Sequence, residues 1–443
     1  MRPFCSRHPS QCPLALTVAM GLTLLSLSLP GHAAPRGSLI SDTLVRDYSV
    51  QALSGLAGQT LALTGAPRCG VQMRELLYRT VGVHGEPATA SAMLLLPQGP
   101  GCTGSQPLLG WARGTETLRD SQQASQEPGG PATALMTFYA AQGYVVAATD
   151  YLGLGKSDYR FHPYLHADSE ASAIIDALRA ARLAGKQDAV RLNGKVALAG
   201  YSQGGHASMA AQRAIEKDFS TEFDLRASAP MSGPYALSQT FLDNWNSPHG
   251  TGDALAPYLF VYTLNSMQNT YRNIYGNAEQ VLKPPYAEQV QGRFPGKERL
   301  MDMARAGLLP PLGVGDNLRQ ARFAEDFVSN PRNALRVDLV RNDLLAWTPK
   351  TPTALCGSSR DTVVPWRNAQ TASQVFEGRG VKVTLVDVDA QIPKDVDGIA
   401  AHTSWGAALC MAKTRRLLLD PLMFDGGDRA VEQQLPVRQP NPA

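Results

Sequence analysis

The chain has 443 residues, of which 44% are hydrophobic and 18% are charged, with 40 glycines and 31 prolines. This length predicts one large domain or two unequal ones, and the composition excludes an extended coiled coil, a collagen-like repeat and a disordered chain. The formal net charge is +3, and the sequence contains no cluster of Lys and Arg. We therefore expect no nucleic-acid partner, because such partners require a basic surface.

The first 33 residues have the features of a cleaved signal peptide. Arg2 and Arg7 give a basic start, an apolar run of 16 residues covers positions 14–29, and small residues lead to a cleavage position after Ala33. The alternative is an uncleaved membrane anchor, but about 20 apolar residues are needed to span a bilayer. No later segment of the sequence is long or apolar enough to be an anchor. We expect a secreted or periplasmic protein without an integral membrane segment after signal removal.

The cysteines are consistent with export to an oxidising compartment. Cys5 and Cys12 lie in the predicted signal, and four cysteines remain: Cys69, Cys102, Cys356 and Cys410. Four cysteines allow three connectivities, and their spacing matches no metal site. Segments 71–78 and 88–96 predict a hairpin that brings Cys69 towards Cys102, which leaves Cys356 for Cys410. Each bridge would stabilise the fold by roughly 2–4 kcal/mol; buried free thiols are the alternative.

After the hairpin, short apolar runs alternate with helical patterns. Between the second and third of these runs, residues 169–183 place apolar side chains at helical spacing. A later strand is expected within residues 381–388. Such alternation predicts an α/β fold with a mostly parallel sheet flanked by helices. The runs that read as strands buried on both faces are residues 107–111, 145–149, 195–199 and 354–356.

The strand pattern is interrupted between residues 235 and 350, where helix-like segments broken by proline replace it. An insert of this length is too long for a loop, so we expect a small helical cap, or lid, at the edge of the sheet. The main domain then consists of residues 34–234 and 351–435. Residues 436–443 are expected to form a loose tail.

Residues 200–206, with the sequence Gly-Tyr-Ser-Gln-Gly-Gly-His, contain a G-x-S-x-G motif. When this motif lies between a strand and a helix, the sharp turn holds its central residue in a strained conformation. Glycine on either side of the serine lets the crowded backbones pass. The predicted strand at 195–199 and the helix-compatible run after the motif supply this context, so Ser202 is the candidate nucleophile.

A serine hydroxyl needs an imidazole to take its proton, and the imidazole needs an acid to orient it. Asp361 lies in the loop after the predicted strand at 354–356, and His402 follows 41 residues later. Both come after Ser202, in the order that α/β-hydrolases use. We expect Asp361 to orient His402 and His402 to act as the base.

Other side chains compete for these two roles. His206 lies one helical turn past the serine and would point along the helix, so we expect it to be structural, and His162 and His166 precede the serine. For Asp361, a solvated turn aspartate is the alternative, but its loop is the expected place for the acid. Four other aspartates lie nearer to the candidate base in sequence: Asp387, Asp389, Asp395 and Asp397.

An acyl-transfer intermediate carries an oxyanion that needs two backbone donors. The N–H of Gln203, at the start of the helix after the serine, is one candidate. The other is expected from the loop after residues 107–111, with the N–H of Thr115 as the candidate and an ordinary strand-ending turn as the alternative. This chemistry needs no metal and no cofactor.

The sequence resembles the α/β-hydrolase superfamily and, within it, bacterial relatives of the secretory lipase (lipase A-like) family. The resemblance implies an α/β-hydrolase fold, a helical cap between nucleophile and acid, and cleavage of carboxylic esters and triacylglycerols. Members of the family often have His-Gly-Thr where this chain has Arg113-Gly114-Thr115, an exchange that keeps the backbone donor. The segments that carry the resemblance are residues 150–155, 162–165, 200–206, 342–349 and 357–365.

Together these features predict a secreted serine esterase or lipase that forms an acyl-enzyme from a small-molecule or lipid ester. A serine peptidase or an acyltransferase would use the same triad, and a non-catalytic binding protein on the hydrolase fold is a third alternative. The cap is a candidate for transient contact with a lipid interface. We also predict that cap tyrosines set the acyl-length preference, with simple helix packing as the alternative for each. These are Tyr235, Tyr258, Tyr262, Tyr271, Tyr275 and Tyr286.

Overall fold

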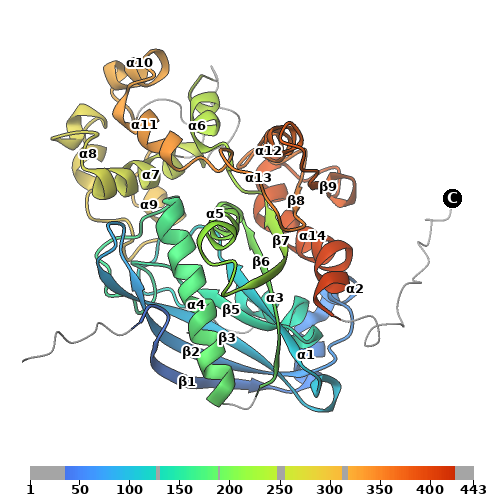
Figure 1. The fold of residues 1–443 in the computed structure, drawn as a ribbon. Helices are drawn as coiled ribbons and strands as arrows, with labels where there is room; N and C mark the ends of the chain where they lie inside the picture. The colour runs from blue at the N-terminus through green and yellow to red at the C-terminus, as the bar shows by residue number, and fades with distance from the viewer. Residues whose placement is uncertain (1–34, 126–129, 188–189, 247–254, 312–317, 425–443) are drawn as a thin grey trace, which may run out of the picture. The chain divides into compact units, whose positions relative to one another are not determined.

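The computed structural model describes residues 35–125, 130–187, 190–246, 255–311 and 318–424. The predicted signal peptide at 1–33 and the predicted tail at 436–443 lie outside these ranges. In the described residues, nine strands form one sheet in the order β1-β2-β3-β5-β4-β6-β7-β8-β9 (Figure 1).

One end of the sheet is antiparallel. β1 (Leu39–Tyr48) pairs with β2 (Gly70–Val81), and β2 pairs with β3 (Pro87–Gln98) in an unbroken register. The predicted hairpin is therefore confirmed, although both of its strands are longer than expected. Cys69 and Cys102, just outside its two ends, form a disulfide with their Cα atoms 5.7 Å apart.

The rest of the sheet is parallel. In its centre, side chains on both faces are buried: every residue of β4 and β5 is buried, as are the second halves of β6 and β7, whereas β9 at the edge is mostly exposed. The predicted strands at 107–111, 145–149, 195–199 and 354–356 are confirmed, whereas β1 and β7 were not predicted and β9 is shorter than expected. The strands are β5 (Val145–Thr149), β4 (Gln106–Ala112), β6 (Leu192–Tyr201), β7 (Asp224–Met231), β8 (Ala354–Gly357) and β9 (Thr384–Asp387).

Helices cover both faces of the sheet and enclose two separate hydrophobic clusters (Figure 1). On one face, α4 (Ala167–Gln187), α5 (Gln203–Asp218) and α12 (Arg367–Glu377) bury their apolar stripes. The other face packs α1 (Val50–Ala57), α3 (Pro131–Phe138) and α14 (Ala407–Thr414). The α/β-hydrolase fold class predicted from the sequence is thus confirmed. Shorter helices are α2 (Leu61–Thr64), α13 (Gly398–Ala400) and α15 (Asp420–Met423).

Between β7 and β8 the described chain forms six helices around a third hydrophobic cluster. This helical insertion contacts the loops that follow the parallel strands: the Tyr262 hydroxyl donates to the Glu116 carbonyl at 2.8 Å, and the Thr117 hydroxyl donates to the Glu298 carbonyl at 3.2 Å. Its helices are α6 (Leu237–Asn246), α7 (Ala256–Tyr271), α8 (Tyr286–Gln289), α9 (Leu300–Arg305), α10 (Ala321–Ser329) and α11 (Ala334–Arg341). No helix within the described ranges is long and apolar enough to cross a membrane.

Candidate active site

Ser202 occupies the sharp turn between β6 and α5. Its φ of 62° and ψ of −122° are strained for a residue with a side chain, which is the backbone expected for a nucleophile elbow. The flanking glycines are required by space. A Cβ at Gly200 would overlap the Gly204 carbonyl, and a Cβ at Gly204 would overlap the carbonyl of Ala112 in β4. The turn therefore presses against the neighbouring strand and presents the serine at the carboxyl edge of the sheet.

Three side chains that are far apart in the sequence meet at this edge. The His402 Nε2 lies 2.9 Å from the Ser202 Oγ, and the His402 Nδ1 lies 2.6 Å from an Asp361 carboxylate oxygen. Because a carboxylate only accepts, Nδ1 carries the proton that it shares with Asp361, and Nε2 is left free to accept the serine proton. The predicted nucleophile, base and acid are thus brought into one hydrogen-bonded chain.

The loop after β8 fixes the Asp361 carboxylate. Its second oxygen accepts the backbone N–H groups of Val363 and Val364, both at 2.9 Å. Asp361 and His402 are each only 5% exposed as whole residues. A carboxylate held on both oxygens cannot rotate away from the imidazole, so this loop presets the orientation of the ring.

His402 lies on a wide helical turn, a π-helical segment at Ala401–Gly406. The Tyr201 hydroxyl donates to the His402 carbonyl at 2.9 Å, and a Cβ at Gly406 would overlap this hydroxyl. Wide turns of this kind often lie at functional sites, because they displace one side chain from the regular helical positions. Tyr201, the residue before the serine, thereby connects the nucleophile's strand to the segment of the base.

A disulfide joins Cys356 in β8 to Cys410 in α14, with Cα atoms 5.7 Å apart. β8 leads into the loop of Asp361, and α14 follows the turn that carries His402. The bridge therefore connects the acid's strand to the helix behind the base. The provisional pairing from the sequence is confirmed for both disulfides.

The loop after β4 runs beside the serine. A Cβ placed on Gly114 would be 3.8 Å from the Ser202 Cβ, and the Thr115 hydroxyl is hydrogen-bonded to the Tyr164 hydroxyl at 2.9 Å. The Tyr164 ring stacks on Tyr262 of α7 with centroids 4.4 Å apart and planes 2° from parallel. The Thr115 side chain is therefore fixed by its hydrogen bond to Tyr164. Its backbone N–H belongs to the loop that runs next to the nucleophile.

Arg113 holds the other end of this loop. Its buried guanidinium pairs with Glu116 at 3.0 Å and with Asp150 at 3.4 Å, and the Tyr151 hydroxyl donates to the Arg113 carbonyl at 3.0 Å. Burial raises the pKa of Asp150 to about 6, against the effect of the neighbouring guanidinium. Arg113 thus supplies an ion-paired clamp that fixes the loop geometry.

With this geometry established, comparisons identify the relatives of the chain. The family model described as secretory lipase matches residues 132–405, more than half of the sequence. The crystal structure of LipA, a rice cell wall degrading esterase from Xanthomonas oryzae, is 45% identical, covers 88% of this chain and 100% of LipA, and gives a TM-score of 0.82.

The chain belongs to the secretory lipase family. It is a carboxylic ester hydrolase, as the family match and the esterase structures together establish. A hydrolase from Legionella pneumophila (22% identity, TM-score 0.74, 85% of this chain and 97% of the other) shares the fold. So does Candida antarctica lipase A (17% identity, TM-score 0.55, 79% and 76%). Among curated proteins, no sequence matches.

In this family member, the alternative aspartates near His402 have other partners. Asp387 accepts the Ser359 N–H at 3.1 Å, Asp389 pairs with Arg360 at 3.3 Å, and Asp397 caps α13. Asp395 is exposed. Of the five aspartates weighed, it is Asp361 that lies against the imidazole.

His206 is fully buried, and both of its ring nitrogens face acceptors. Nδ1 lies 2.8 Å from the Glu170 carboxylate and Nε2 lies 2.9 Å from the Asn342 carbonyl. The expected structural role agrees with these contacts, because neither nitrogen reaches Ser202. Glu170 and Asn342 were missed in the sequence, where Glu170 reads only as an acid in the first turn of an amphipathic helix.

Glu170 also holds the residue that follows the nucleophile. Its second carboxylate oxygen accepts from the Gln203 side-chain amide at 2.8 Å and from the Leu165 N–H at 3.2 Å. The same amide donates to the His162 Nε2 at 2.8 Å, while His162 Nδ1 donates to the Leu152 carbonyl. Burial lowers the pKa of His162 to about 4, so the ring is neutral. The first turn of α5 is thereby tied to two other segments.

The cap tyrosines were expected to offer a surface to the acyl chain, and for Tyr235, Tyr258 and Tyr262 this is wrong. All three are buried. The Tyr258 hydroxyl donates to the Pro310 carbonyl at 2.6 Å, and the Tyr262 hydroxyl is bonded to Glu116. Tyr235 packs in the cluster between the sheet and α4, α5 and α12, whereas Tyr258 and Tyr262 pack within the insertion. If these three tyrosines affect the acyl-length preference, they would do so indirectly, through the residues that they pack against.

Proposed function

We propose that the chain hydrolyses esters through an acyl-enzyme on Ser202. The observation that carries this proposal is the unbroken chain of hydrogen bonds from the Ser202 Oγ through His402 to Asp361, at 2.9 and 2.6 Å. His402 takes the serine proton as Oγ attacks the ester carbonyl, and then gives it to the leaving alcohol. Water, deprotonated by the same imidazole, releases the acid. Asp361 keeps the imidazole in the required tautomer and stabilises its charged form.

The oxyanion of each tetrahedral intermediate is proposed to accept the backbone N–H groups of Gln203 and Thr115. Gln203 begins α5, where the helix dipole and free N–H groups favour negative charge. Thr115 lies on the loop that passes next to the serine and is held through Tyr164. Donors fixed before the reaction stabilise the transition state without reorganisation, which is the main source of rate in such sites.

The decisive experiment is a series of p-nitrophenyl esters from acetate to palmitate, assayed with the wild type and with Ser202→Ala. We expect the variant to lose roughly 10⁶-fold in kcat, since the nucleophile acts as a unit with its base. Unchanged melting of the variant would exclude unfolding as the cause. Full activity in the variant would overturn the mechanism.

A peptidase or an acyltransferase would use the same side chains, and a non-catalytic binding protein is a third reading. Matched p-nitrophenyl ester and p-nitroanilide substrates separate esterase from peptidase action. Adding a short alcohol tests transfer, because an acyltransferase would form the new ester in preference to the free acid. If the protein is an esterase, we expect it to cleave the ester and to transfer the acyl group mainly to water.

We further propose that the enzyme acts outside the cytoplasm, in the medium or the periplasm. The secretory description of the family, the signal-like first 33 residues and the two disulfides support export. The proposed substrates are lipid or small-molecule esters. Because the similar LipA is described as degrading rice cell wall, cell-wall esters belong in the substrate panel. We also propose that the cap makes transient contact with a lipid interface. The same assays test this by comparing the rate of hydrolysis of an emulsified ester with that of a dissolved one.

A further inference from the structure

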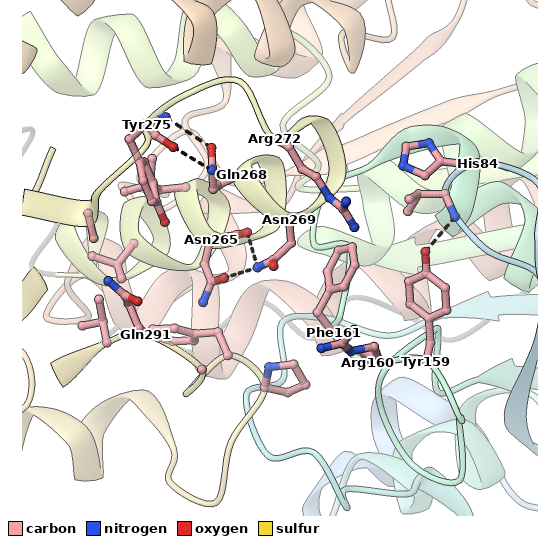
Figure 2. A pocket seen from close by; sticks show the side chains of 18 of the residues that line it. His84, Tyr159, Arg160, Phe161, Asn265, Gln268, Asn269, Arg272, Tyr275 and Gln291 are labelled. Carbon is pink, nitrogen blue, oxygen red and sulfur yellow. Dashed lines mark hydrogen bonds between the residues drawn. The ribbon is translucent and has the colours of Figure 1, made fainter. Parts of the chain in front are cut away.

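A cavity of about 880 Å³ lies away from the triad (Figure 2). One wall is α7, and the others are the β2–β3 turn, residues 158–161 and residues 290–295. None of Ser202, Asp361 and His402 lines it. Its volume lies in the range of ordinary ligand sites, which are concave and apolar with a few polar groups that fix orientation.

Apolar residues form part of the cavity lining, beside polar side chains such as Gln268 and Gln291. Val261 and Leu264 contribute from α7, and Leu282, Val290 and Phe294 from the chain that follows. All five side chains are at most 5% exposed and belong to the hydrophobic cluster of the insertion. An apolar chain placed here would extend an existing core, which favours its binding by about 25 cal/mol per Å² removed from water.

The rim carries hydrogen-bond donors without protein partners. Figure 2 shows Arg272 at the end of α7 pointing towards Phe161, with Arg160 beside this ring and His84 opposite. Within the described ranges, neither guanidinium makes an ion pair or a side-chain hydrogen bond, and both side chains are exposed. A guanidinium offers five donors and no acceptor, so its natural ligand is an anionic oxygen.

The two acids of the rim are engaged by the hairpin and its neighbours. Glu86 accepts from the Tyr159 hydroxyl at 2.5 Å and from the His84 N–H at 2.9 Å. Asp158 accepts from the Thr89 N–H at 2.8 Å. Both carboxylates are therefore held in place by the hairpin and its neighbours, whereas neither Arg160 nor Arg272 has an ion-pair partner among the described residues.

We propose that this cavity binds a long-chain carboxylate, with the chain against α7 and the carboxylate on Arg272 and Arg160. That such acids are also the products of the enzyme rests on the proposed function; the binding itself does not. Phe294 lines the cavity and stacks on Tyr262, with ring centroids 5.0 Å apart. Tyr262 in turn stacks on Tyr164, the partner of Thr115. The bound chain would thus touch one end of the aromatic stack that reaches the loop beside the nucleophile.

The test measures binding of sodium laurate, kept below its micellar concentration, to Ser202→Ala protein by calorimetry. Four variants, each made in the Ser202→Ala protein, test whether laurate binds in this cavity. Arg272→Gln and Arg160→Gln each remove a guanidinium, and Asn265→Trp fills the cavity from the partly exposed side of α7. Arg332→Gln, an exposed arginine of the same insertion that does not line the cavity, is the matched control.

We expect one saturable site in the parent and the control. Affinity should fall about tenfold in Arg272→Gln and in Arg160→Gln, the usual scale for losing a charge-assisted hydrogen bond. Asn265→Trp should also weaken binding, because its ring takes the space of the ligand chain. Dodecanol should bind about tenfold more weakly than laurate. Absence of saturable laurate binding, equal binding of dodecanol, or binding unchanged in all three cavity variants would overturn the proposal. Binding of the protein to phosphatidylglycerol vesicles without binding of laurate would overturn it too, by assigning the rim to lipid headgroups. Ester hydrolysis is measured separately, with Arg272→Gln in protein that retains Ser202. A failure of the laurate-binding proposal would therefore not count against the proposed triad mechanism.

Discussion

Two buried imidazole–carboxylate pairs lie close to Ser202, and they do different things. In one, His402 is 2.6 Å from Asp361; in the other, His206 is 2.8 Å from Glu170. The difference lies at the far nitrogen. His402 meets the Ser202 hydroxyl, which can donate a proton, whereas His206 meets the Asn342 carbonyl, which can only accept one. An imidazole held by an acid becomes a base only where its other nitrogen faces a group that can lose a proton.

The largest expected effect separates the two imidazoles directly. His402→Ala should lower kcat by roughly 10⁶-fold, because the serine loses its proton acceptor. His206→Ala should leave kcat of the folded fraction within about tenfold of the wild type while lowering the free energy of unfolding by about 3 kcal/mol, since it strands a buried carboxylate. Urea unfolding and steady-state kinetics on both proteins provide the measurement. Equal losses of kcat would contradict the distinction.

A second prediction concerns the carboxylates. Glu170→Gln should lower kcat by about tenfold to a hundredfold with little change in KM, because Glu170 positions Gln203 at the start of α5. The matched control is Glu216→Gln, a buried acid on α5 that instead accepts the N–H groups of Lys350 and Thr351. We expect the control to lose stability but not kcat. If both variants behave alike, Glu170 is a structural residue and not a positioning one.

The smallest effect comes from a third buried imidazole, His162, whose ring nitrogens contact the Leu152 carbonyl and the Gln203 amide and which stays neutral. Its pKa is lowered by burial to about 4, against about 6.5 in an unfolded chain. The unfolded state therefore binds more protons between these values, and stability falls as the pH falls through this window. His166 acts in the same direction and Asp150, with its raised pKa, in the opposite one.

The contribution of His162 is isolated by comparing the wild type with His162→Gln. Between pH 6.5 and pH 5, the wild type should lose about 2 kcal/mol more of its free energy of unfolding than the variant. Chemical denaturation at the two pH values measures this difference. Equal losses in the two proteins would mean that the His162 ring is protonated in the folded state.

The sequence predicts those parts of the molecule that depend on local pattern. The hairpin, the parallel strands and α4 follow from alternation and helical spacing, and the elbow follows from glycines that no other residue could replace at 200 and 204. Asp361 and His402 could be ordered along the chain because the fold class fixes which loop carries each. β1, which is mostly exposed, gives no such signal. β7 begins with charged residues and is followed at once by Gly233 and Pro234, which mark the start of the insertion.

What the sequence could not predict depends on contacts between distant segments. Nothing near Glu170 indicates that its carboxylate receives the side chains of Gln203 and His206, 33 and 36 residues away. The tyrosines of the insertion look alike in the sequence, yet Tyr262 is buried while Tyr275 lines the cavity. Burial of each ring is decided by which face of α7 or its neighbours meets the loop after β4, and composition carries no information about this.

The disulfide between Cys356 and Cys410 has a further consequence for proteolysis of the chain. It closes a covalent ring of the chain that contains both Asp361 and His402. A single cut of the backbone between Asp361 and His402 would open this ring without releasing either residue. The two fragments, one with the acid and one with the base, would stay joined by the disulfide. A nicked enzyme of this kind would run as one band until reduced and would keep its acid and base tethered in the meantime.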